Sequence, residues 1–242
     1  MLLSIFRWII GIIFSFFVGS AAIISSILTG NGDIVHFITR VWGMGMCRLT
    51  GVRVEVIGAE NILRDRAQIF TSNHQGMYDI FALQGYLPIR FLWIAKESLF
   101  KIPVIGRTMR RAGYIGINRS SPKKFLKSLQ RAIDEIKGGR SIVIFPEGTR
   151  TRDGSIGTFK RGSLYLIFKT GAPVVPIAIS GSFNVIKKGE FVINPGNIRI
   201  FIGKPIDACS FNEKDEDKLL NMLRDVTVKN LKEMEGTKDI KI

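Results

Sequence analysis

The longest uncharged stretch of the chain, residues 8–32, limits the possible folds more than any other feature of the sequence. No Asp, Glu, Lys or Arg lies between Arg7 and Asp33, and Ile, Phe, Val, Ala and Leu dominate the run Trp8–Leu28. About 20 apolar residues in a helix cross the hydrocarbon core of a bilayer. Small residues dilute the run, namely Ser15, Gly19, Ser20, Ser25 and Ser26. The segment therefore predicts a membrane helix of moderate hydropathy.

A cleaved signal peptide is the competing interpretation of this stretch, since Gly19-Ser20-Ala21 offers small residues for cleavage. However, Arg7 is the only charged residue ahead of the run, and the apolar sequence continues well past the cleavage position. These two features favour an uncleaved anchor.

A second helix is predicted after the turn signal Gly30-Asn31-Gly32. Two sets of residues recur at helical spacing on opposite sides: Ile34, Ile38, Val41, Trp42 and Leu49 on the apolar side, and His36, Arg40, Gly43 and Cys47 on the other. This pattern is typical of an amphipathic helix that does not span a membrane. The pair forms either a hairpin that dips into one leaflet or a spanning helix followed by a surface helix. We expect His36 to be a packing residue, because only Asp33 offers it an acidic neighbour.

The net charge of +15 belongs to the rest of the chain, because residues 1–50 contain only three arginines and one aspartate. A basic surface attracts nucleic acid, anionic lipid headgroups and phosphorylated substrates alike.

Cys47 and Cys209 are far apart and form no CxxC motif, which argues against a disulfide framework or a zinc site. With His36 and His74 as the only histidines, we expect no metal.

Strands alternate with helices beyond residue 50. Strands are predicted at 52–57, 68–72, 90–95, 114–118, 141–145, 174–179 and 198–202, and helices at 78–85, 122–137 and about 213–234. Alternation of this kind predicts an α/β fold, with a mixed, largely parallel sheet flanked by helices. We therefore divide the chain into a membrane-associated helical hairpin, residues 1–50, and an α/β domain, residues 51–242.

One histidine and one carboxylate lie together after the second predicted strand, in Asn73-His74-Gln75-Gly76-Met77-Tyr78-Asp79. If His74 begins a helix and Asp79 lies within it, the carboxylate reaches back to the imidazole, and the pair works as a general base. Taken alone, the spacing favours a histidine that merely caps a helix. In parallel sheets, functional groups gather beyond the carboxyl ends of strands, and the loop Pro146-Glu147-Gly148-Thr149-Arg150 has the same placement.

Positive charge is concentrated in residues 96–131, which hold ten basic residues against the single acid Glu97. Lys123, Lys124 and Lys127 fit a solvated helix face. Lys96 and Arg119 are different because each directly follows a predicted strand. Arg150 lies in the loop at the end of another predicted strand, and guanidinium groups suit bidentate phosphate recognition. These features predict a site that activates a hydroxyl beside an anionic group.

The sequence resembles the glycerolipid acyltransferases, and among them most closely the 1-acyl-sn-glycerol-3-phosphate acyltransferases. Four blocks match in order: the H-x4-D motif of His74 and Asp79, Gly113–Arg119, Phe145–Arg150 and Val175-Pro176-Ile177. The stretch Phe159-Lys160-Arg161-Gly162 and an N-terminal membrane element match as well. Four ordered blocks over about 105 residues make the resemblance specific.

The resemblance implies acyl transfer from an acyl thioester to the free hydroxyl of 1-acyl-sn-glycerol 3-phosphate, which gives phosphatidic acid. His74 would be the general base and Asp79 its orienting partner. Glu147, Gly148, Thr149 and Arg150 would bind the glycerol phosphate, and Arg119 and Lys96 would add positive charge. No cofactor is implied, since acyl-CoA or acyl carrier protein is a co-substrate. The expected location is the inner (cytoplasmic) membrane, with the catalytic domain at the cytosolic face and in contact with anionic lipids.

Other functions remain open on sequence grounds. The same chemistry fits another lysophospholipid, glycerol 3-phosphate or a lyso-aminolipid as the acceptor. A serine lipid hydrolase lacks support because there is no G-x-S-x-G motif. A non-enzymatic basic membrane tether is the alternative from another class. Nucleic acid is not expected as a partner, because aromatic residues do not interleave with the basic cluster as in a base-stacking surface.

Overall fold

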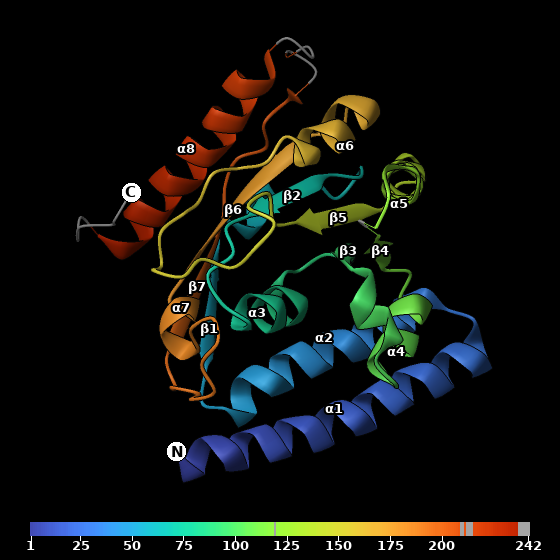
Figure 1. Ribbon diagram of the computed structural model, residues 1–242, viewed down its shortest axis with the longest axis vertical. Coiled ribbons are helices and arrows are strands. Elements are labelled where there is room, and N and C mark those ends of the chain that lie inside the picture. The colour runs from blue at the N-terminus through green and yellow to red at the C-terminus, as the bar shows by residue number, and fades with distance from the viewer. Residues whose placement is uncertain (119, 209–210, 212–214, 237–242) are drawn as a thin grey trace.

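Residues 1–118, 120–208, 211 and 215–236 are described by the structure, a computed structural model (Figure 1). Within them, seven strands form one sheet in the order β1-β7-β6-β2-β5-β3-β4. The strands are β1 (Arg53–Ile57), β2 (Ile69–Ser72), β3 (Phe91–Lys96), β4 (Ile115–Ile117), β5 (Ser141–Ile144), β6 (Val174–Ser180) and β7 (Asn197–Ile202). Neighbouring strands are parallel except β6 and β7, which are antiparallel. The predicted mixed, largely parallel sheet is confirmed.

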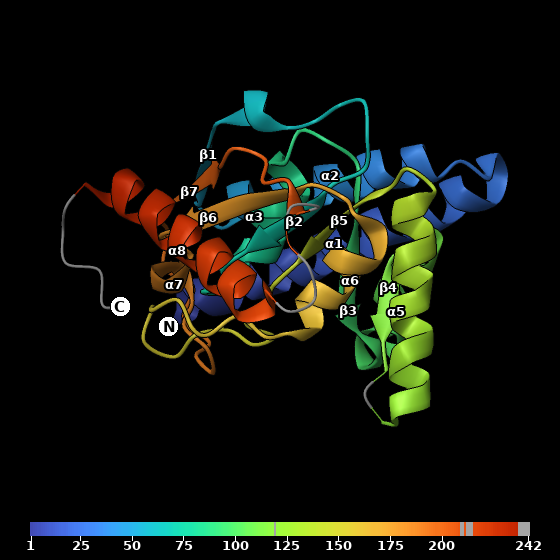
Figure 2. The same cartoon turned by 90° about the horizontal axis from the view of Figure 1, so that it is seen from above.

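Helices cover both faces of the sheet (Figures 1 and 2). They are α3 (Tyr78–Tyr86), α4 (Ile105–Arg111), α5 (Pro122–Lys137), α6 (Gly162–Thr170), α7 (Ser182–Val185) and α8 (Glu216–Glu235), with short 3-10 turns η1 (Ala59–Asn61) and η2 (Glu97–Lys101). In Figure 1, α3 lies below the sheet, while α5, α6 and α8 lie above it. Strands β2 and β5 are buried along their whole length, as expected for apolar strands covered on both faces.

Helices α4, α6 and α7 were not predicted from the sequence. They have seven, nine and four residues, too few for a clear period of 3.6. Helix α5 begins as predicted, because the Ser121 hydroxyl accepts a hydrogen bond from the Lys124 N–H and Pro122 occupies the first turn. Helix α8 begins at Glu216 in the structure; residues 213 and 214, where its start was predicted, lie outside the described residues.

The first fifty residues form the predicted helical hairpin, α1 (Leu2–Thr29) and α2 (Gly32–Leu49). In Figure 1 the two helices run antiparallel beneath α3. The turn between them uses Gly30, which has a φ of 61°, and Asn31, whose side chain accepts a hydrogen bond from the Asp33 N–H. Helix α2 packs against α3, so the hairpin and the sheet domain share one hydrophobic core.

The structure shows which side of α2 packs against the rest of the protein. The mixed side, which includes His36, Gly43 and Cys47, is buried, whereas Val41 and Leu49 on the apolar side are exposed. Gly43 allows this packing because a Cβ atom there would lie 2.6 Å from the Gly85 backbone nitrogen in α3. His36 packs edge-on against the Phe91 ring at 5.6 Å, so its expected packing role is confirmed.

Helix α1 has large apolar side chains outside and small residues inside. Its buried residues are Ser4, Gly11, Ala22 and Ser26, and its exposed ones include Phe6, Ile9, Ile13 and Phe17. The inner serines make contacts, since the Ser15 hydroxyl accepts a hydrogen bond from Trp42 Nε1 at 2.8 Å. Among the described residues, α1 is the one helix long and apolar enough to cross a membrane. An exposed apolar face of this length indicates membrane association.

Candidate active site

The predicted site residues come together because β2, β5 and β3 are parallel neighbours in the sheet. His74 follows β2, the segment Pro146–Arg150 follows β5, and Lys96 is the last residue of β3. The carboxyl ends of parallel strands point to the same edge, so these residues meet there. Arg119, the remaining predicted site residue, lies outside the described residues.

His74 and Asp79 form the predicted pair. Nδ1 of His74 lies 2.7 Å from Oδ2 of Asp79, and the Asp79 side chain is fully buried. Helix α3 begins at Tyr78, as predicted, so His74 lies in the loop ahead of the helix. Asp79 lies in the first turn of α3, where Oδ2 also accepts the Gln75 and Gly76 N–H groups at 2.8 Å each. A carboxylate in this position is favoured by the helix dipole.

The contacts of Asp79 define which nitrogen of His74 acts as an acceptor. Because Oδ2 already accepts two backbone N–H groups, we assign its carboxylate as ionised and Nδ1 of His74 as the protonated ring nitrogen. Nε2 then carries a free lone pair, and no hydrogen-bond partner for it occurs in the described part of the chain. This arrangement is chemically suited to remove a proton from a hydroxyl group.

Phe145 fixes the plane of the His74 ring. The two rings stack at 3.9 Å with an angle of 12° between their planes, and Phe145 stacks in turn on Trp93 at 5.7 Å. From the sequence, Phe145 was predicted as the end of a strand and as the first residue of the block Phe145–Arg150, without a role toward His74. Its position directly before Pro146-Glu147 was the available signal, but stacking depends on the pairing of β2 with β5.

Glu147 is tied to the backbone of the site. Its Oε1 accepts the His74 N–H at 2.8 Å and its Oε2 accepts the Gly157 N–H at 2.9 Å, while only 5% of the residue is exposed. Burial raises the pKa of Glu147 above its ordinary value, and the two backbone hydrogen bonds oppose that shift. Both oxygens are already in use, so this geometry favours support of His74 over the predicted contact with a substrate.

The loop after Glu147 presents polar groups around a tight turn. Gly148 has a φ of 69°, in the left-handed region that favours glycine. The Lys188 ammonium group donates hydrogen bonds to Thr149 Oγ1 at 2.9 Å and to the Arg150 carbonyl oxygen at 3.1 Å. Sequence reasoning missed Lys188, because it comes from the connection between α7 and β7, about 40 residues away along the chain.

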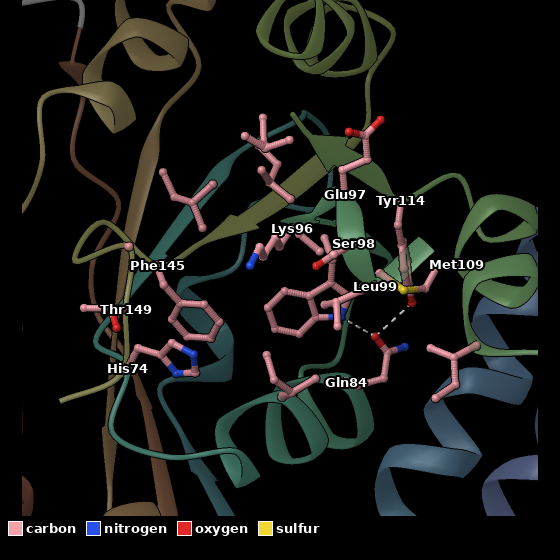
Figure 3. Close-up of a pocket in the computed structure, with 18 of the residues that line it drawn as sticks. His74, Gln84, Lys96, Glu97, Ser98, Leu99, Met109, Tyr114, Phe145 and Thr149 are labelled. Carbon is pink, nitrogen blue, oxygen red and sulfur yellow. Dashed lines mark hydrogen bonds between the residues drawn. The ribbon is translucent and has the colours of Figure 1, made fainter. Parts of the chain in front are cut away.

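A cavity of about 1170 Å³ extends from this loop into the protein. Basic side chains line it near the strand ends: Lys96, Arg150, Lys160 and Lys188. Elsewhere its wall is largely apolar and comes from α1, α3 and α4, with Val18, Ile80 and Ile105 among its residues. In Figure 3, His74, Phe145 and Thr149 lie at one end of the view and Met109 at the other. The cavity therefore has a cationic end and an apolar end, and the ring of His74 lines the same cavity.

A buried hydrogen-bond network borders the apolar part of the cavity (Figure 3). Oε1 of Gln84 accepts Trp93 Nε1–H at 2.7 Å and the Tyr114 hydroxyl at 2.9 Å, and its Nε2 donates to Thr39 Oγ1 at 3.0 Å. Burial raises the pKa of Tyr114 to about 12, so the hydroxyl keeps its proton. The network ties α2, α3 and β3 together and leaves the polar groups of Gln84 satisfied.

Comparison with known proteins identifies the family. Residues 53–180 match the sequence profile of the family described as Acyltransferase. The chain belongs to the acyltransferase family. It is 34% identical over 210 residues to the chloroplastic 1-acyl-sn-glycerol-3-phosphate acyltransferase BAT2 of Brassica napus, covering 81% of this chain and 60% of that protein. It is 33% identical over 184 residues to the 1-acyl-sn-glycerol-3-phosphate acyltransferase of Borreliella burgdorferi, covering 76% and 73% respectively.

A solved acyltransferase has the same fold. The crystal structure of the 1-acyl-sn-glycerophosphate (LPA) acyltransferase PlsC from Thermotoga maritima matches with a TM-score of 0.85 and 29% identity, covering 99% of this chain and 97% of that chain. The chain spans 60% and 48% of the length of two chloroplastic relatives, so it matches only part of those proteins. The resemblance inferred from the four sequence blocks is confirmed at the level of the family.

Proposed function

We propose that this protein is a 1-acyl-sn-glycerol-3-phosphate acyltransferase that uses His74 as its general base. The observation that carries the proposal is the 2.7 Å contact between His74 and Asp79, placed between a cationic and an apolar end of one cavity. A lysophospholipid needs both ends, because it combines an anionic headgroup with an acyl chain. The relatives named above support this choice of acceptor over glycerol 3-phosphate or a lyso-aminolipid.

In the proposed reaction, Nε2 of His74 removes the proton from the free hydroxyl of the acceptor. The hydroxyl oxygen attacks the carbonyl carbon of the acyl thioester and forms the new ester C–O bond. The C–S bond then breaks, and the leaving thiolate takes up the proton held on Nε2. Asp79 keeps the imidazole in the correct tautomer and stabilises its positive charge. No covalent acyl-enzyme is required, since the acceptor itself is the nucleophile.

The basic end of the cavity would bind the acceptor phosphate. Arg150 and Lys188 approach from the loops after β5 and α7, and Lys96 from the end of β3. In Figure 3 the ammonium end of Lys96 points toward the side of the cavity that holds Phe145. Thr149 offers a hydroxyl, and Gly148 gives the loop its turn. Arg119 keeps its proposed role from the family motif. Charge-assisted hydrogen bonds of this kind are stronger than neutral ones.

The apolar end would hold an acyl chain, and the outer face of α1 would hold the protein in one leaflet. Helix α1 contacts the domain in its first turn, at Ser4, and again beyond its middle, at Gly19. A helix attached along its length lies beside the domain and does not project across a bilayer. A membrane-resident acceptor and a thioester donor from the cytosol, whether acyl-CoA or acyl carrier protein, would meet at this interface.

An acyl-transfer assay in detergent micelles tests the proposal. The full chain receives an acyl-CoA or acyl carrier protein donor, with 1-acyl-glycerol 3-phosphate and other lysophospholipids competing as acceptors. We expect a preference for the phosphate monoester and a loss of at least about 10³-fold in the His74→Ala variant, with its fold retained. A preference for an acceptor without phosphate, or a folded His74→Ala variant with near-normal activity, contradicts the proposal. Release of free fatty acid without transfer indicates a hydrolase.

A further inference from the structure

The connection between α7 and β7 exposes an aromatic side chain on an otherwise anchored loop. Ile186 and Ile193 are buried and hold the ends of the connection. Between them, Phe191 is 78% exposed and Val192 is 40% exposed. We call residues 187–192 the Phe191 loop. Large apolar side chains exposed together in this way mark a surface that meets a partner.

The Phe191 loop is fastened to the first turns of α1. Trp8 Nε1 donates a hydrogen bond to the Phe191 carbonyl oxygen at 2.9 Å, and Arg7 donates one to the Ile193 carbonyl oxygen at 2.9 Å. The Ser4 hydroxyl accepts the Ile193 N–H at 3.2 Å, and the Trp8 and Phe191 rings lie 5.9 Å apart. Figures 1 and 2 both place this connection beside the N-terminal end of α1. Phe191 therefore extends the exposed apolar face of α1.

The charges of the loop suit a lipid headgroup region. Lys187 is exposed beside the apolar tip, and Lys188 holds its ammonium group at Thr149 and Arg150, so positive charge lies next to the tip. Basic residues next to aromatic ones favour the interface of an anionic membrane, where the ring enters the acyl boundary and the ammonium groups stay among the phosphates. An aqueous protein partner would not account for the continuity of Phe191 with the apolar face of α1.

We propose that the Phe191 loop is a second membrane contact, which inserts Phe191 and Val192 into the same leaflet that α1 occupies. This inference rests on the membrane attachment in the proposed function. A protein held by a single helix in the interface can rotate about the axis of that helix. A second membrane contact to one side of the helix prevents this rotation. Lys188 of the same loop bonds to Thr149 and Arg150, so lipid contact at Phe191 holds the cationic end of the cavity at the membrane surface.

Site-specific labelling tests the contact without reference to activity. An environment-sensitive nitrobenzoxadiazole label is attached to Phe191→Cys in a Cys209→Ser background, while the buried Cys47 stays unlabelled. The matched control is Leu126→Cys on α5, which is 52% exposed and lies away from α1. Vesicles contain phosphatidylcholine and phosphatidylglycerol, with or without doxyl-labelled acyl chains. We expect quenching by doxyl lipid to be at least about threefold stronger at position 191 than at position 126.

Equal quenching at the two positions overturns the proposal. Lipid-independent cross-linking between copies through the introduced thiol of Phe191→Cys, without quenching, also overturns it and identifies a second copy of the chain as the partner. A further readout compares Phe191→Asp with Leu126→Asp on acceptor held in vesicles. We expect about a fivefold lower rate for Phe191→Asp alone, and no difference on a dispersed short-chain acceptor. If the unmodified protein transfers no acyl group, the proposed function fails, yet the quenching result still decides the membrane contact.

Discussion

The carboxylate of Glu147 accepts the backbone N–H of His74 at 2.8 Å, which joins the loop after β5 to the loop after β2. Its other oxygen accepts the Gly157 N–H, so one buried side chain connects three segments. A residue that binds substrate and a residue that supports the base have different kinetic signatures. The role of Glu147 can therefore be decided by experiment.

Replacing Glu147 by Ala should lower kcat about 10²-fold and change the KM for the acceptor less than about threefold. The reason is that two buried N–H groups lose their acceptor, each at a cost of about 1–3 kcal/mol, and the position of His74 loosens. Steady-state kinetics and thermal unfolding measure both effects. Glu147→Gln should lie between the wild type and Glu147→Ala. A large rise in the KM of the acceptor with kcat preserved would show instead that Glu147 binds substrate.

Replacing Asp79 by Asn should lower kcat by about 10²- to 10⁴-fold. A neutral amide does not stabilise the imidazolium, and it allows the tautomer with the proton on Nε2, which is unable to act as a base. Kinetics on the purified variant measure the loss, and circular dichroism checks that the fold is retained. Asp225→Asn, an exposed position on α8, is the matched control and should keep full activity. Normal activity of Asp79→Asn would exclude the pair as the general base.

Replacing Lys188 by Met should raise the KM for the acceptor about tenfold and leave kcat within about threefold. The substitution keeps the length of the side chain and removes the charge that lies beside Thr149 and Arg150. Lys229→Met on α8 is the control, because Lys229 is exposed and pairs only loosely with Glu233 at 3.9 Å. Initial rates over a range of acceptor concentrations separate KM from kcat. A pure kcat effect would mean that Lys188 does not contact the acceptor.

Replacing Met109 by Trp should shift the preferred acyl chain to one shorter by roughly two to four carbons, because each methylene group contributes about 0.8 kcal/mol when buried. Met109 lies at the apolar end of the cavity, far from His74 in Figure 3. Competition between thioesters of roughly 10 to 18 carbons measures the preference. Met222→Trp on α8, outside the cavity, should leave the preference unchanged. An unchanged preference in Met109→Trp would place the end of the acyl chain elsewhere.

Local sequence patterns were enough to predict which strand ends form this site. An apolar run followed by a loop with His74 or Glu147 identified strand ends, and the parallel arrangement then implied that they meet. Contacts that depend on which strands are neighbours could not be predicted from the sequence. The stacking of Phe145 on His74 requires β2 and β5 to be adjacent, and the bond from Lys188 to Thr149 requires a distant loop to fold back.

The buried side of α2 could not be predicted, for a different reason. Helical periodicity finds two sides of a helix, but it does not say what each side meets. In water, Val41 and Leu49 would face the core. Beside a membrane they face outward, and Gly43 and His36 pack inward because close helix contact needs small or shape-matched side chains. The same spacing of apolar residues therefore marks the buried side of a helix in water and the outward side of a helix beside a membrane.

Helix α1 packs against the protein with an inner face of small residues and exposes an outer face of large apolar ones. The residues that hold the helix in the fold are therefore different from those that limit solubility. Ser4 and Ser15 bond to the rest of the protein, whereas Phe6, Ile13 and Phe17 point away from it. Outer positions are thus free to change without disturbing a packed contact. Exchanging them for glutamate and lysine should yield a detergent-free protein with an intact site, a practical route to crystals and to kinetics in plain buffer.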